Sequence, residues 1–326
     1  MLNGFRGTNG ISGERLGGRV AIMFKMKEGS SMENHHWGHA TWTELAGLGL
    51  GPGGAGGSAR TPSGLRVVAV LPVGAVEAHG PHLPLTTDVT IAAAAAEAAL
   101  DGVRRLGLRP MLLPPLPYTA APFAAGFPGT ISVRPATFAA LLEDVAASLE
   151  RQGVAALVVV NAHLDPAHLT AIRDVARARE APAAAAPSRH QGETPSRRRD
   201  DAPARHAASA QHRQPMPVIH PDLTARRWAS RLTDEFKSGA CHAGRYETSV
   251  VMAAAPELIR EDERRGLVEN PASLSVAIRQ GAATFEDAGV GEAYCGDPAA
   301  ATREEGERTI AVLGGIVVDA VEEVLS

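Results

Sequence analysis

The amino-acid sequence predicts an α/β fold in which a mostly parallel sheet is covered by helices on both faces. Short apolar runs rich in Val and Leu alternate along the chain with longer segments of high helix propensity. The runs show no alternation of polar and apolar residues, which is typical of strands buried on both faces. The chain has 326 residues, of which 44% are hydrophobic, so it is long enough to fill such a core.

Each element follows from its own local pattern. The run RVVAVLPV at 66–73 predicts the first strand, and AALVVV at 155–160 predicts another. We expect further strands at 111–113 and 217–219, and helices at 89–106, 136–152, 166–177 and 223–236. A capping box of Thr302 and Glu305 predicts a last helix, which continues with apolar residues at helical spacing.

Three segments do not follow this alternation. Residues 1–36 are polar and Gly-rich, so we expect a disordered leader or an overlong gene start before a single domain at 37–326. Residues 47–64 are mostly Gly, Pro and Ser and predict a loop, because little apolar surface is available to offset the lost backbone entropy. Residues 181–216 are rich in Ala, Pro, Ser and Arg and predict a disordered surface insertion.

Charge and cysteine content exclude several classes of protein. The net charge is -4, and the three consecutive arginines in 181–216 are offset by Asp200 and Asp201, so no nucleic-acid or anionic-membrane partner is expected. Cys241 and Cys295 are too few for a disulfide framework, and no apolar run approaches the roughly 20 residues of a membrane span. We expect a cytoplasmic protein that acts on a small molecule or a short peptide.

The strongest chemical signal directly follows the first strand. The segment GAVEAHGPHLPLTTD at 74–88 places Glu77, His79, His82 and Asp88 within twelve residues. Ligands of open α/β sheets bind beyond the carboxyl ends of the strands, where this segment lies. Carboxylates and imidazoles are the usual ligands of zinc and manganese. The cluster therefore predicts a metal site, although Asp88 alone could also cap the following helix.

Two further clusters carry the same residue types. NAHLD at 161–165 ends the strand at 155–160 with His163 and Asp165, of which Asp165 could also cap the helix that follows. HAGRYETS at 242–249 brings His242 and Glu247 to a Gly turn before an apolar segment. Together the three clusters predict one shared site.

The three motifs resemble the signature of the creatininase family. The segment at 74–88 is similar to the family pattern ExHGxHLP with its following loop aspartate, NAHLD to an NGH turn, and HAGRYETS to HAGxxETS. FPGT at 127–130 and GDP at 296–298 are similar to further family landmarks. The resemblance covers 37–326 apart from the two low-complexity stretches. It implies a three-layer α/β/α creatininase-like sandwich and a homo-oligomer, a hexamer in the family.

The resemblance also implies an activity. It would make the chain a metal-dependent amidohydrolase with two divalent ions, zinc, manganese or iron, which activate a water against a C–N bond in a cyclic amide, a formamide or a small peptide. By class this is a hydrolase of carbon–nitrogen bonds other than peptide bonds. Carried over by position, the implied metal ligands are Glu77, His79, Asp88 and His163, with Asp88 bridging the ions.

The resemblance leaves the second metal incomplete. Either Asp165 or Glu247 would complete it, because creatininase itself has an acidic ligand at the position of Asp165, whereas many relatives have Gly there. His242 would be the proton-transfer residue, and Glu247 would belong with it to the catalytic centre.

Other functions are less consistent with the sequence. The glycines at 47–57 precede the first strand and no GK[ST] follows them, which excludes a phosphate-binding loop, and no GxSxG elbow of a serine hydrolase occurs. A non-catalytic metal-binding or regulatory protein with this fold remains the alternative, although it would not need His242. Creatinine is disfavoured as substrate, because creatininase closes tryptophans around its ring and only Trp228 lies near this motif.

Overall fold

The computed structural model describes residues 35–53, 57–180, 215–239 and 242–326. A four-stranded sheet runs through it in the order β2-β1-β3-β4, and every pair of neighbouring strands is parallel. Its strands are β1 (Arg66–Val73), β2 (Leu108–Leu112), β3 (Ala156–Asn161) and β4 (Val218–Ile219). The predicted α/β fold with a parallel sheet is confirmed, and three of the strands overlap the predicted ranges within two residues.

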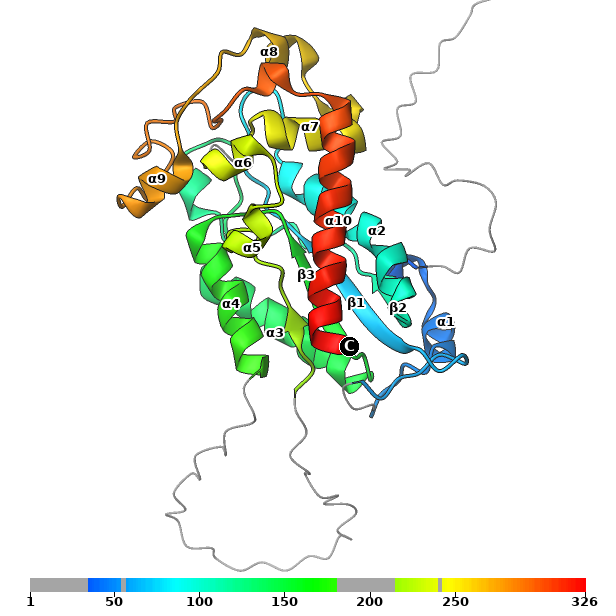
Figure 1. Cartoon of the computed structure of the whole chain (residues 1–326). Helices are drawn as coiled ribbons and strands as arrows, with labels where there is room; N and C mark the ends of the chain where they lie inside the picture. Colours follow the sequence, from blue (N-terminus) through cyan, green and yellow to red (C-terminus); the bar gives the residue numbers. More distant parts are fainter. Residues whose placement is uncertain (1–34, 54–56, 181–214, 240–241) are drawn as a thin grey trace, which may run out of the picture. The chain divides into compact units, whose positions relative to one another are not determined.

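Helices pack on both faces of this sheet, as Figure 1 shows. The longer ones are α2 (Thr87–Arg105), α3 (Pro135–Arg151), α4 (Pro166–Glu180), α7 (Arg245–Ala254) and α10 (Arg303–Leu325). The short ones are α1 (Trp42–Gly47), α5 (Arg226–Ala229), α6 (Asp234–Ser238), α8 (Glu261–Gly266) and α9 (Leu274–Arg279). Four single 3-10 turns are η1 (Trp37–His39), η2 (Pro122–Ala124), η3 (Pro256–Leu258) and η4 (Pro298–Ala300).

Side chains of the central strands divide between two hydrophobic cores. Val68 and Val70 of β1 face the core formed with α2, α7 and α10. Val67 and Ala69 face the opposite core, formed with α3 and α4. Successive strand residues point to opposite faces, so a strand must be apolar throughout when both faces are covered. This is the physical reason that RVVAVLPV lacks alternation.

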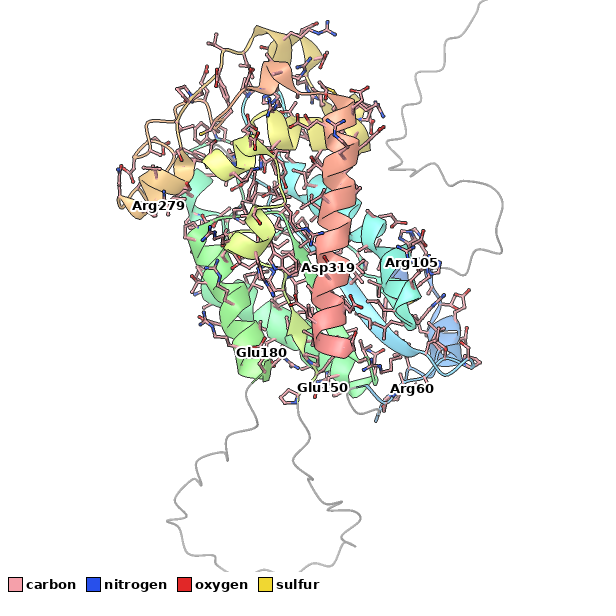
Figure 2. The ribbon with its side chains drawn as sticks, viewed as in Figure 1. Arg60, Arg105, Glu150, Glu180, Arg279 and Asp319 are labelled. Atoms are coloured by element: carbon pink, nitrogen blue, oxygen red, sulfur yellow. The ribbon has the colours of Figure 1, made fainter. Side chains whose placement is uncertain are left out.

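Helices α3 and α4 are joined by a buried arginine. The Arg179 guanidinium donates hydrogen bonds of 2.5 and 2.9 Å to Glu143 and one of 2.9 Å to Glu150, which is labelled in Figure 2. Glu150 also accepts a hydrogen bond from the backbone N–H of Met216, at the start of the segment that leads into β4. One ion-pair cluster therefore fixes the edge strand to the helical layer.

Two expectations about helices were wrong. The predicted helix at 223–236 is two short helices, because Thr233 accepts a hydrogen bond from the Phe236 N–H and starts α6 as a new helix. The capping box of α10 is only half formed. Thr302 accepts from the Glu305 N–H, but the Thr302 N–H donates to Ser249, and the Glu305 carboxylate lies 3.3 Å from Arg245 instead.

The low-complexity stretch at 47–64 contributes to the core more than its composition predicts. Leu50 and Ala59 are buried against the α3 side of the sheet, although the described residues after Gly47 form neither helix nor strand there. The expected leader at 1–36 and the expected insertion at 181–216 lie outside the described residues except at their carboxyl ends, where His36 forms an isolated bridge with Leu112 and Met216 is buried in the core. None of the described helices combines the length and the apolarity needed to cross a bilayer.

Close packing between α10 and α7 gives a test of the fold. A methyl group on Gly306 would overlap the carbonyl oxygen of Ser249, whereas one on Gly315 of the same helix would meet only the mobile end of Arg231, at 3.3 Å. We expect Gly306→Ala to lower the free energy of unfolding by about 1–3 kcal/mol, the usual cost of overpacking. Gly315→Ala should raise it by up to about 1 kcal/mol through helix propensity. Urea unfolding of both variants measures this, and equal stabilities would contradict the packing.

Candidate metal centre

The loop after β1 is held in place from several sides. The Glu77 N–H donates to the Leu85 carbonyl at 2.9 Å within the loop. The Ala78 N–H donates at 3.2 Å to the hydroxyl of Thr130, so the FPGT segment holds the loop in place. Gly80 has a φ of 61°, a conformation that favours glycine, and its N–H donates to the Ala293 carbonyl. These contacts aim the loop's polar side chains inward.

Asp88, in the first turn of α2, lies between two imidazoles. Its Oδ1 is 3.2 Å from Nε2 of His79, and its Oδ2 is 3.1 Å from Nδ1 of His163. Glu77 Oε1 lies 3.1 Å from the same nitrogen of His163. All four residues are at most 4% exposed. The carboxylate of Asp88 is thus shared by two clusters of possible ligands.

Both imidazoles have one nitrogen occupied by the backbone. His79 Nδ1 donates to the Glu77 carbonyl at 3.1 Å, and His163 Nε2 donates to the Ala120 carbonyl at 2.9 Å. A carbonyl can only accept, so each of these nitrogens carries a proton, and the other nitrogen of each ring faces the carboxylates. This is the arrangement in which metal-ligating histidines are held by their outer hydrogen bond.

The segment before α7 adds Glu247 and His242. Glu247 Oε2 lies 3.7 Å from Nε2 of His79 and accepts a hydrogen bond of 2.6 Å from the Ala243 N–H. Ala243 has a φ of 52°, a left-handed conformation that costs a non-glycine residue about 1–2 kcal/mol. The strained turn places the buried His242 ring 4.2 Å from that of His79, centre to centre.

Among the residues that the structure describes, three groups of side chains could each hold a metal ion. Their members are Glu77, Asp88 and His163; His79, Asp88 and Glu247; and Glu77, His79 and His242. In each group the possible ligand atoms lie within 4.8 Å of one another. The first two groups share Asp88, so one carboxylate would serve two cations if both groups were occupied.

Asp165 and His82 lie outside these groups. The Asp165 carboxylate accepts from three backbone N–H groups, those of Phe123 at 3.0 Å, Ala167 at 2.8 Å and His168 at 3.4 Å, so it caps α4 and fixes the loop that carries Phe123. His82 is buried away from the cluster, with Nε2 2.8 Å from the Thr248 hydroxyl. The sequence placed both among the metal-site clusters, but it could not show that backbone N–H groups would engage Asp165 or that the Thr248 hydroxyl would contact His82.

Burial and charge strongly shift the pKa values of the cluster. Burial alone would lower the pKa of His79, but the carboxylates of Asp88, Glu247 and Glu77 raise it to about 10. Burial raises the pKa of Glu247 to about 8. The pKa of Asp88 is held well below its usual value by His79 and His163, despite burial. Such a field of buried carboxylates favours bound positive charge.

The pKa of His242 is shifted in the opposite direction to that of His79. Burial and the positive charge of His79 hold the pKa of His242 well below its ordinary value, so the ring is neutral. Its Nε2 donates to the Ala78 carbonyl at 2.8 Å, which leaves Nδ1 as a lone-pair acceptor. A neutral imidazole with a free nitrogen beside a carboxylate cluster can take up and return a proton.

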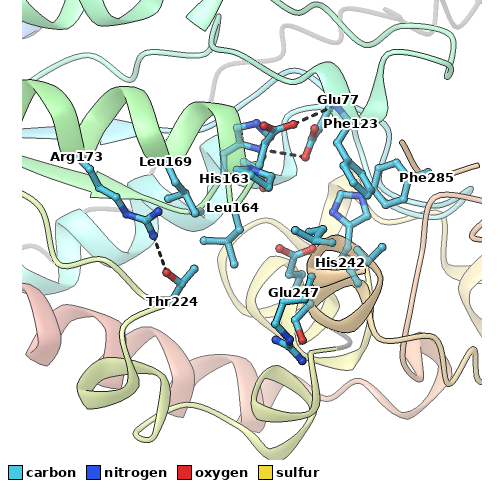
Figure 3. Close-up of a pocket in the computed structure, with 18 residues that line it drawn as sticks. Glu77, Phe123, His163, Leu164, Leu169, Arg173, Thr224, His242, Glu247 and Phe285 are labelled. Atoms are coloured by element: carbon cyan, nitrogen blue, oxygen red, sulfur yellow. Dashed lines mark hydrogen bonds and ion pairs between the residues drawn. The ribbon is translucent and has the colours of Figure 1, made fainter. Parts of the chain in front are cut away.

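A cavity of about 300 Å³ opens onto the cluster. Its lining includes Glu77, His163, His242 and Glu247, which Figure 3 labels among the side chains drawn around it. Apolar side chains also line it: Phe123, Leu164, Leu169, Leu274, Ile278 and Phe285. Leu164 belongs to the NAHLD motif, but the sequence did not predict the contribution of Phe285 and α9, because they come from segments far from the motifs.

Family comparison agrees with the motifs. Residues 60–321 match the creatininase family, which is described as creatinine amidohydrolase. The chain belongs to the creatininase family. This confirms the predicted resemblance and identifies the chain as a member of a hydrolase family.

Relatives within the creatininase family differ in what they act on. A mycofactocin precursor peptide peptidase of Mycolicibacterium smegmatis is 30% identical over 247 residues, which is 75% of this chain and 80% of the relative. A zinc–zinc form of a creatininase variant superposes with a TM-score of 0.59 at 22% identity, covering 90% of this chain and 99% of that one. A manganese form of creatininase gives 0.57 at 22% identity, over 90% and 99% of the two chains. At this identity the two structures establish the three-layer fold alone.

Buried neutral histidines make the stability of this creatininase-family chain sensitive to acid. Burial lowers the pKa of His82 to about 4, and those of His168 and His242 well below the ordinary value. An unfolded histidine has a pKa of about 6.5, so between the two values the unfolded chain binds more protons and stability falls as pH falls. Each histidine contributes up to about 1.4 kcal/mol per pH unit in this window.

Urea unfolding between pH 6.5 and 4.5 tests this sensitivity. We expect His82→Gln to flatten the loss of stability with falling pH. His39→Gln, at an exposed histidine, serves as the control and should keep the wild-type slope. A slope that is unchanged in His82→Gln would contradict the buried neutral state.

Proposed function

We propose that this chain is a metal-dependent amidohydrolase with two divalent cations per chain. One cation would be held by Glu77, Asp88 and His163, and the other by His79, Asp88 and Glu247. The observation that carries the proposal is the sharing of Asp88 by two groups of buried ligands. Mixed nitrogen and oxygen ligands suit zinc, manganese or iron, and creatininase structures are known in zinc–zinc and manganese forms.

Glu247 is the better candidate than Asp165 for the second cation. Glu247 Oε2 approaches the ring of His79 on the side of Asp88, whereas both oxygens of Asp165 are engaged by backbone N–H groups. Asp165 would instead support the wall by fixing Phe123. Two cations at these positions would supply a polarised carbonyl and an acidified water.

The chain's own residues would do the remaining chemistry. His242, with Nδ1 free, would take a proton from the attacking water and return it to the departing nitrogen. Glu247 would belong with His242 to the catalytic centre as the carboxylate that holds the second cation. Phe123 and Phe285 would exclude bulk water at the cluster, because both are buried and line the cavity.

The substrate class proposed is a small amide, a formamide or a short peptide. Either kind of bond is consistent with the family, because one relative is named as a peptide peptidase and the family as a creatinine amidohydrolase. No tryptophan lines the described cavity, and Trp228 is buried under Arg227 and Arg231, which disfavours creatinine. A cytoplasmic homo-oligomer remains a prediction.

Metal content tests the ligand assignment. Elemental analysis after reconstitution with zinc, manganese or iron should find close to two ions per chain. Asp88→Asn should lose both ions because it removes the bridge, and Glu247→Gln should lose one. Asp165→Asn is the matched control: it should keep both ions and a helix cap of similar strength, because Asn caps helices about as well as Asp. Absence of bound metal in the wild type would favour the non-catalytic alternative.

Substitution of His242 separates proton transfer from ligation. His242→Asn should retain both metals and the melting temperature while turnover of an amide substrate falls roughly 10²–10⁴-fold, the range of general acid–base catalysis. Metal content, melting temperature and turnover are measured on one preparation. Loss of a metal would make His242 a ligand with Glu77 and His79, and full activity would exclude it from the mechanism.

A further inference from the structure

The cavity has a buried acidic end and an open cationic end. Glu77, Asp88 and Glu247 are at most 4% exposed and form its inner end. Two arginines, Arg173 and Arg279, belong to the same lining. Arg279 is exposed and also lines the cavity, so it lies at the mouth. The cavity therefore changes its electrostatic character between the metal cluster and solvent.

The two arginines differ in their partners. Arg173 lies 2.6 Å from the Asp222 carboxylate and donates a hydrogen bond of 2.8 Å to Thr224, which Figure 3 shows, so its charge is already offset. Arg279 forms no ion pair or hydrogen bond with any side chain that the structure describes. It is the cation of the lining whose charge is not balanced within the described chain.

Arg279 is nevertheless carried by a fixed element. It ends α9, which Figure 2 shows at the outer edge of the fold. Leu274, at the start of α9, is buried with Phe123 and Phe285 in a small separate core, and the Ser273 hydroxyl before it donates to the Ser238 carbonyl. The helix that carries Arg279 is thus anchored to the fold at its start.

The same lining carries apolar side chains. Leu164, Leu169 and Ile278 line the cavity together with the acidic cluster and Arg279. A substrate that fills the cavity must then place an apolar segment against this wall. A group reaching the mouth meets a guanidinium, which binds carboxylates through two parallel hydrogen bonds.

We propose that Arg279 is a substrate-binding residue and that the preferred substrates are N-acyl derivatives of apolar amino acids, or short peptides ending in them, with a free carboxylate. The scissile amide would lie at Glu77, Asp88 and Glu247, the apolar side chain against Leu169 and Ile278, and the carboxylate on Arg279. Hydrolysis adds one water across the C–N bond and releases an acid and an amine. This inference rests on the proposed function.

The test compares charged and uncharged forms of one substrate series. Formyl, acetyl and short peptidyl derivatives of leucine and phenylalanine are prepared as free acids and as N-methylamides, and products are identified by mass spectrometry. We expect kcat/KM to favour the acids about tenfold, the effect of one charge-assisted contact at an exposed site. The formyl and peptidyl arms distinguish small N-acyl amino acids from peptide ends.

Variants assign the preference to Arg279. In Arg279→Gln the acid-to-amide ratio should fall to near one, and Arg279→Lys should retain part of it. Arg308→Gln removes the same charge from an exposed position on α10 outside the cavity and should keep the wild-type ratio. A ratio near one in the wild type, or one that Arg279→Gln leaves unchanged, would overturn the inference while amide hydrolysis stands.

If no member of the series is hydrolysed, binding measurements test the carboxylate site at Arg279. Calorimetry then compares N-acetyl-L-leucine with its N-methylamide on metal-loaded protein. Tighter binding of the acid that is lost in Arg279→Gln would support the carboxylate site although the proposed function fails. Equal binding of the two compounds would overturn the site as well.

Discussion

The carboxylate of Asp88 between two imidazoles is the interaction on which the candidate site depends. Its two oxygens face His79 and His163, which come from different strand ends, so one side chain joins the loops after β1 and β3. Buried charges are costly unless they are paired, and each imidazole is additionally fixed by a backbone carbonyl. The arrangement is electrostatically self-consistent only when positive charge, as protons or metal ions, occupies it.

The parallel sheet makes this convergence possible. The carboxyl ends of β1 and β3 lie at the same edge because neighbouring strands are parallel, and Val73 pairs with Asn161 at that edge. Asn161 then organises the second loop, since its side-chain amide donates to the His163 carbonyl and its oxygen accepts from the His163 N–H. Asn161, the last residue of β3, therefore sets the direction of the neighbouring site residue His163.

Sequence alone predicted the parts of the fold that depend on local pattern. Uniformly apolar runs located β1 and β3, and the motifs located all members of the carboxylate–imidazole cluster. The break between α5 and α6 was missed because a mid-segment Thr233 can end one helix and start the next only if its hydroxyl is free to cap. The choice between Asp165 and Glu247 depends on which backbone N–H groups surround each carboxylate. The place of Arg279 in the cavity lining depends on segments that lie more than a hundred residues apart in the sequence. The spacing of residues within the motifs encodes neither of these.

The packing of α10 against α2 has a consequence for how the protein is made. A methyl group on Gly314 of α10 would come within 2.9 Å of Ala98 of α2, so the two helices approach closely, and α2 carries Asp88 in its first turn. Since α10 follows every ligand residue in the sequence, the loops leave the ribosome before the helix that secures their frame exists. Chains emerge from the ribosome with their amino-terminal elements first, so the site would become rigid only after α10 has been made. Uptake of metal into the rigid site would therefore follow the synthesis of α10.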